Sequence, residues 1–96
     1  MRVMVKVEMN TAASTKAVKD GSLGKFMGAF IEKFKPEAAY FLPADGKRAA
    51  LFFLDMKDNS QMPSIVEGWW STVEATVSVT PAMNFDDLIK GLKSLA

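Results

Sequence analysis

The sequence predicts a single α+β domain whose strands and helices follow the order β-α-β-β-α-β, with one more helix at the C-terminus. Three observations lead to this expectation. An Asp45-Gly46 pair lies between two apolar, β-rich runs, which is a strong signal for a β-hairpin. Patterns of helical period flank this hairpin on both sides, and an alternating strand pattern lies beyond each of them. The length of 96 residues suits one domain, which we place at residues 1–96.

The first strand is expected over residues 1–9. Val3, Val5 and Val7 alternate there with charged residues and methionine, and this period of two with an enrichment in valine is typical of a half-buried strand. The valine face is therefore expected to point into the core, and the opposite face to carry Arg2, Lys6 and Glu8.

Two helical segments follow the first strand. Asn10 and Thr11 are suitable caps for a short helix that runs to about residue 19, with a small apolar face. The sequence Asp20-Gly21-Ser22 breaks this helix, and a second helical run is expected over residues 23–35. Pro36 ends that run because a residue before proline avoids the α region. The apolar faces of the two segments are expected to comprise Ala12, Ala13, Ala17 and Val18, and Phe26, Phe30, Ile31 and Phe34, respectively.

The hairpin is expected to have strands at 38–42 and 48–56, joined by residues 43–47. Glycine at position 46 supplies the positive φ that a tight turn needs. After the hairpin, a turn ending in residues suited to helix N-caps precedes a helix that runs to about residue 73, with Pro63 in its first turn.

The last two elements are a strand over residues 75–80 and a short amphipathic helix. Val77 and Val79 share one face of the strand, and Thr76, Ser78 and Thr80 share the other. Asn84 is a suitable N-cap for the C-terminal helix, and acidic residues occupy its first turn, where the helix dipole favours negative charge.

The second hairpin strand is apolar on both faces, because Ala50, Phe52 and Leu54 alternate with Leu51 and Phe53. A strand of this kind needs cover on each side of the sheet. Helices cover one side, so we expect a second copy of the chain to cover the other. The sequence thus predicts a homodimer with a semi-polar chamber between sheet and helices or between the two sheets.

This element order resembles the ferredoxin-like, dimeric α/β-barrel superfamily, which includes muconolactone isomerases and cofactor-free monooxygenases of the antibiotic-biosynthesis type. Segments 35–41, 45–48 and 53–58 are similar to an uncharacterised bacterial group within it. The topological resemblance covers nearly the whole chain and implies a dimeric barrel that binds a small organic molecule. The first helix, interrupted at Gly21, departs from the single helix usual in the superfamily, and a haem-degrading member would need a histidine that this chain lacks.

The composition excludes several classes of function. The chain has no cysteine and no histidine, so it offers no thiol nucleophile, no Ser-His triad and none of the usual zinc or haem ligands. No cofactor and no metal are expected. The net charge of +1 gives no reason to expect binding to a phosphate backbone. Charged residues interrupt the first apolar run and no stretch is long enough for a membrane span, so we expect a soluble cytoplasmic protein.

The residues that could carry chemistry lie mainly on the predicted strands. Lys6, Glu8 and Asp55 could move protons if a semi-apolar chamber shifted their pKa values, as an isomerase needs, and ion pairing on the sheet is the simpler interpretation. Arg2 is expected beside them, and Tyr40, the only phenol, could orient a carbonyl group.

Trp69 and Trp70 form the largest aromatic cluster. Adjacent helical residues point about 100° apart, so one tryptophan is expected in the core and the other in a pocket or subunit contact.

A third hypothesis comes from Gly21-Ser22-Leu23-Gly24, which resembles the nucleotide-clamping G-x-x-G loop of KH domains. Leu23 is unsuited to contact with phosphates, although Lys19 and Lys25 flank the segment. The sequence alone therefore favours a dimeric small-molecule-binding protein, with a cofactor-free isomerase or monooxygenase of small cyclic or aromatic compounds as the alternative. A KH-like binder of single-stranded nucleic acid is the second alternative.

Overall fold

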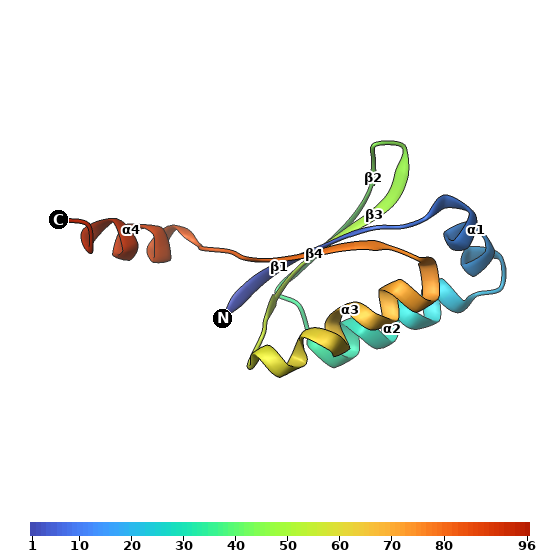
Figure 1. Ribbon diagram of the computed structural model, residues 1–96, viewed down its shortest axis with the longest axis horizontal. Coiled ribbons are helices and arrows are strands. Elements are labelled where there is room, and N and C mark those ends of the chain that lie inside the picture. The colour runs from blue at the N-terminus through green and yellow to red at the C-terminus, as the bar shows by residue number, and fades with distance from the viewer.

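A computed structural model describes all 96 residues, and it shows a four-stranded antiparallel sheet with three helices on one face (Figure 1). The arrangement is α+β and is compatible with a ferredoxin-like fold. The strands lie in the order β2-β3-β1-β4, so the first strand of the chain is central. The strands are β1 (Arg2–Glu8), β2 (Ala38–Ala44), β3 (Lys47–Asp55) and β4 (Thr76–Pro81).

The helices are α1 (Thr11–Lys19), α2 (Ser22–Phe34), α3 (Met62–Val73) and α4 (Phe85–Lys93), and a 3₁₀ turn, η1 (Asn59–Gln61), precedes α3. Helices α2 and α3 lie side by side across the sheet, α1 lies at one end of the molecule, and α4 extends from the other end (Figure 1). The break between α1 and α2 is confirmed: Gly21 adopts φ 81°, a left-handed conformation that costs glycine little. No helix combines the length and apolar character needed to cross a membrane.

The hairpin connection is shorter than the sequence suggested. Only Asp45 and Gly46 form the turn, with φ 53° and 75°, and Ala44 already pairs with Lys47. Two positive φ values in succession match the right-handed twist of the flanking strands, which explains the two-residue turn. Pro43 belongs to β2, where it is tolerated because β2 is an edge strand.

The pairing register confirms the predicted separation of faces. Val5 lies opposite Phe52 on one side and Val79 on the other, while Lys6 lies opposite Leu51 and Ser78. The valine side faces the helices and forms a continuous core, so we call it the covered face. Its most deeply buried members are Val3, Val5, Val7, Phe52 and Leu54. The other side, called the open face below, carries no helix.

The predicted apolar face of α1 was partly wrong. Val18 is 51% exposed, and Ser14 is fully buried in its place, beside Ala17 in the next turn. Ser14 can be buried because its hydroxyl donates to the Thr11 carbonyl at 3.2 Å and accepts from Arg48 at 3.0 Å. Burial of a hydroxyl that keeps its hydrogen bonds costs little free energy. Positions 14 and 17 are three residues apart and therefore lie on one side of the helix.

Candidate functional site

The end of the sheet nearest the hairpin turn holds a cleft of about 710 Å³ between β2–β3 and helices α1 and α2. This volume lies within the range typical of small-molecule sites. We call it the Arg48 cleft. It is lined by Met9, Thr11, Thr15, Leu23, Met27, Phe41, Leu42, Pro43, Gly46, Lys47, Arg48 and Ala49.

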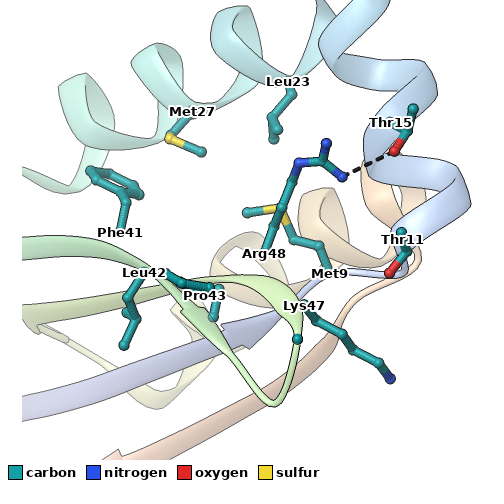
Figure 2. Close-up of a pocket in the computed structure, with 12 residues that line it drawn as sticks. Met9, Thr11, Thr15, Leu23, Met27, Phe41, Leu42, Pro43, Lys47 and Arg48 are labelled. Atoms are coloured by element: carbon teal, nitrogen blue, oxygen red, sulfur yellow. Dashed lines mark hydrogen bonds between the residues drawn. The ribbon is translucent and has the colours of Figure 1, made fainter.

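One wall of the Arg48 cleft is apolar. Figure 2 shows Leu23 and Met27 descending from α2 towards the sheet, with Phe41 rising from β2 towards Met27. Phe41 points to the helices because its pairing partner is Ala50, a residue of the covered face. Phe41 as a residue is 52% exposed, although its ring packs against Phe52 at a centroid distance of 5.8 Å. The wall therefore presents accessible apolar surface rather than sealed core.

Arg48 supplies the polar end of the cleft. Its Nη1 donates hydrogen bonds of 3.0 Å to the Ser14 hydroxyl and 3.0 Å to the Thr15 hydroxyl, which tie β3 to α1. Both partners are neutral, and no carboxylate lies within 4.0 Å of the guanidinium. Nε and Nη2 donate to no protein atom, so three of the five N–H donors of arginine stay available. The guanidinium is thus oriented by hydroxyls while its charge remains uncompensated.

Lys47 lies next to Arg48 in β3, but its side chain points in a different direction. The two side chains point apart, with Arg48 directed between α1 and α2 and Lys47 directed away from them (Figure 2). Successive residues of a strand alternate in this way. Lys47 also has no acidic partner, so both cations at this end of the sheet are unpaired. Only Arg48 faces the apolar wall.

A second cavity, of about 740 Å³, lies at the opposite end of the sheet and contains two of the predicted site residues, Arg2 and Asp55. Its charges are already compensated within the protein. Arg2 forms ion pairs with Glu37 and, at 3.3 Å, with Asp87, and the first of these raises the pKa of its guanidinium. Although this cavity is slightly larger, its charges are paired within the protein, so it offers no free charged group to a ligand.

Asp55 is held in its ionised form. The hydrogen bond from the Lys57 ammonium, at 2.5 Å, together with that from the N-terminal ammonium, at 2.7 Å, lowers the pKa of Asp55 to about 2. A carboxylate with so low a pKa is a poor proton acceptor near neutral pH. The structure therefore gives Asp55 an ion-pairing position at the end of the internal strand β3.

The other predicted site residues lie on the open face or in the core. Lys6 and Glu8 form an ion pair of 3.3 Å, separate from Arg2 and Asp55, so the four charges do not form one cluster. Tyr40 is 61% exposed on the open face, opposite Leu51.

One tryptophan lies in the core as expected, since Trp69 is fully buried, whereas Trp70 is 47% exposed. Neither lines any of the four principal cavities. Trp69 packs at centroid distances of 4.8 Å from Phe26 and 5.6 Å from Phe52, and its indole N–H has no hydrogen-bond partner.

The segment Gly21-Ser22-Leu23-Gly24 does not form a loop between helices. Its last three residues lie inside α2, and Leu23 is buried. A phosphate-clamping loop presents its central residues to the ligand. This geometry gives the KH hypothesis no support.

Arg48, Ser14 and Thr15 were not predicted as a group from the sequence. One signal was present: Arg48 has the same strand parity as Ala50, Phe52 and Leu54, so alternation places a cation on the helix-covered face. Comparisons with protein-family models, with curated proteins and with solved structures found no match. The functional argument therefore depends on the geometry of the cleft.

Proposed function

We propose that this protein binds a small organic acid with an apolar body in the Arg48 cleft. The observation that supports this most directly is the uncompensated Arg48 guanidinium beside an accessible apolar wall. Nε and Nη2 of an arginine form a planar fork that matches the two oxygens of a carboxylate. Met27 and Phe41 stand where the ligand's apolar part would lie, so the cleft combines orientation with apolar burial.

We also propose that the protein is a homodimer of the dimeric α/β-barrel kind, in which the open faces of two copies meet. Support comes from the half-exposed apolar side chains of this face, among them Tyr40 and Leu42 on β2. Such a surface is costly to leave in water. Static light scattering at micromolar concentration tests this part, and a monomer there would contradict it. A cytoplasmic location stays a prediction.

The enzyme hypothesis has no comparable support. Its candidate proton carriers, Lys6, Glu8 and Asp55, are engaged in ion pairs and none lines the Arg48 cleft. Binding without an assigned reaction is therefore the function that the geometry favours.

The test compares a carboxylate with a neutral probe of the same shape. We expect 2-naphthoate to bind in isothermal titration calorimetry and 2-naphthamide to bind more weakly. The substitution Arg48→Gln should reduce the affinity for 2-naphthoate by about 10- to 100-fold, because a charge-assisted hydrogen bond contributes about 1.5–3 kcal/mol. The affinity for 2-naphthamide should change little.

Lys47→Gln is the matched control, since it removes the same charge from the neighbouring residue, whose side chain is directed away from α1, α2 and the Arg48 guanidinium. We expect the affinity of this variant for 2-naphthoate to fall less than threefold, because Lys47 contributes only a screened, long-range electrostatic attraction. Equal losses in the two variants would show that general positive charge, rather than the Arg48 fork, attracts the acid. If 2-naphthoate does not bind to the native protein, the proposed function is contradicted.

A further inference from the structure

Helix α1 lines the Arg48 cleft with two hydroxyl groups, those of Thr11 and Thr15. The two residues are four positions apart, so they lie on the same side of the helix, one turn from each other. Figure 2 shows both on the part of α1 that is turned towards Arg48. The apolar wall comes from other elements, α2 and β2. The cleft therefore has a polar wall, formed by α1 and Arg48, as well as an apolar one.

Both hydroxyls keep a hydrogen-bonding capacity that the protein does not use. The Thr15 hydroxyl accepts from Arg48 at 3.0 Å, but it donates its own proton to no protein atom. In Thr11 the backbone carbonyl accepts from Ser14 at 3.2 Å, while the side-chain hydroxyl forms no hydrogen bond within the protein. A hydroxyl that accepts from a charged donor is polarised, which strengthens its own donation. Helix α1 thus offers two O–H donors to a ligand in the cleft.

The polar side chains that line the cleft supply mainly donors. They belong to Thr11, Thr15, Lys47 and Arg48, and the lining contains no carboxylate and no amide side chain. Arginine and lysine donate hydrogen bonds but cannot accept them. A ligand with an ammonium group would bring a second positive charge beside Arg48 and would find no carboxylate to pair with. The surplus of donors suits a ligand whose polar atoms are acceptors.

A single carboxylate does not use up these donors. In a bidentate pair it takes the Nε proton and one Nη2 proton of Arg48. The hydroxyls of Thr11 and Thr15 are then left to water or to another group of the ligand. A ligand oxygen that replaces the water keeps the hydrogen bond, and such an exchange gives a modest net gain in affinity. A methylene or methyl group in the same place would leave the hydroxyl protons without an acceptor.

We infer that the acid bound in the Arg48 cleft carries an oxygen substituent, and that the hydroxyls of Thr15 and Thr11 donate hydrogen bonds to this oxygen. The class of ligand is thereby narrowed from organic acids in general to hydroxy and oxo acids with an apolar body, and amino acids are disfavoured. The two threonines determine specificity, while Arg48 supplies the main attraction. The inference rests on the proposed function and names the class of acid that the same cleft selects.

The first experiment compares substituents of similar size on 2-naphthoate, placed at each free ring position in turn. A hydroxyl oxygen accepts hydrogen bonds, a methyl group does not, and an aromatic amino group accepts poorly because its lone pair is delocalised into the ring. Isothermal titration calorimetry with the native protein measures the affinities. At one ring position or more, we expect the hydroxy compound to bind about 3- to 10-fold more tightly than the methyl compound, the usual net effect of a neutral hydrogen bond. The amino compound should show no such gain.

The second experiment assigns this preference to α1. Thr11→Val/Thr15→Val replaces both hydroxyls by methyl groups and should bring the affinities for the hydroxy and methyl compounds within about twofold of each other. Thr11→Ser/Thr15→Ser keeps both hydroxyls and should keep the preference. Because Thr15→Val also removes one anchor of Arg48, Ser14→Ala is the matched control: it removes the other anchor but no hydroxyl of the cleft lining. Ser14→Ala should weaken the binding of both compounds and leave their ratio unchanged. Circular dichroism checks that each variant folds.

The outcomes separate the class of acid from acid binding itself. If no ring position favours hydroxyl over methyl in the native protein, or if amino and hydroxyl groups give the same gain, the oxygen-substituted acid is overturned while binding of 2-naphthoate through Arg48 stands. A preference that survives in Thr11→Val/Thr15→Val overturns the role of α1. A native protein that binds neither 2-naphthoate nor any of its substituted forms overturns both proposals.

Discussion

The covered and open faces of the sheet are built from alternate residues of the same strands, and they differ in almost every physical respect. On the covered face Val5, Val7 and Phe52 have no exposed area. On the open face Lys6, which lies between Val5 and Val7, and Tyr40 of β2 remain accessible. The comparison teaches that the buried core is built from one parity of the strand residues, while the accessible surface of the sheet is built from the other.

The largest effect expected from this comparison is a contrast between two adjacent phenylalanines of β3. Phe52→Ala should lower the free energy of unfolding by about 3–5 kcal/mol, since it leaves a cavity among Phe30, Phe41 and Trp69. Phe53→Ala, on the open face, should cost the isolated monomer less than about 1.5 kcal/mol. Urea denaturation at low protein concentration measures both, and equal costs would mean that the open face is covered within one chain.

A smaller effect is expected in the helix layer over the covered face, where two glycines have opposite surroundings. A methyl group on Gly68 of α3 would overlap the ring of Phe26, whereas a methyl group on Gly28 of α2 would meet nothing within 4 Å. Phe26 cannot turn aside freely because it packs edge-on against Trp69 at 4.8 Å. Gly68→Ala should therefore destabilise the protein by about 1–2 kcal/mol, the overpacking cost exceeding the gain in helix propensity.

Gly28→Ala serves as the control and should stabilise the protein by about 0.5–1 kcal/mol through helix propensity alone. Thermal denaturation followed by circular dichroism ranks the two variants. If both alanine variants raise the melting temperature, Phe26 can move aside between α2 and α3 at little cost in stability.

The smallest effect concerns the charges at the rim of the open face. The folded pKa of Asp55, about 2, lies below its ordinary value of 3.8, so its ion pairs contribute stability that is complete above about pH 4 and is lost as the pH falls towards 2. The contribution is small because the side chain is 54% exposed. The melting temperature of Asp55→Asn should lie slightly below that of the native chain at pH 6, and the two should converge near pH 2. A constant difference across this range would assign the effect to something other than carboxylate titration.

Much of the fold was predictable because its signals are local. Asp45-Gly46, the alternating valines of β1 and the aromatic stripe of α2 each depend on neighbours in sequence, and the structure confirms the elements that they predicted. One error was also local in origin. The turn was predicted over residues 43–47, but Pro43 belongs to β2, because proline is compatible with an edge strand.

The cleft was less accessible to sequence reasoning. The role proposed for Arg48 depends on Ser14 and Thr15, more than 30 positions away, because their hydroxyls hold its guanidinium without neutralising it. By contrast, Arg2 meets the carboxylates of Glu37 and Asp87. Strand parity places Arg48 on the covered face and Arg2 on the open face, but it does not show which guanidinium meets carboxylates, because tertiary packing supplies those partners.

The two-residue turn at Asp45-Gly46 has a chemical consequence as well as a structural one. The pairing of Ala44 with Lys47 sets the register of the hairpin. It therefore also determines which residues of β2 and β3 face the core and which face the open side of the sheet. A turn one residue longer that displaced β3 by one position would exchange the places of Arg48 and Lys47. The guanidinium fork would then face solvent, and a flexible ammonium would stand over the apolar wall. In this sense a backbone conformation of two residues determines whether a guanidinium or an ammonium group faces the cleft.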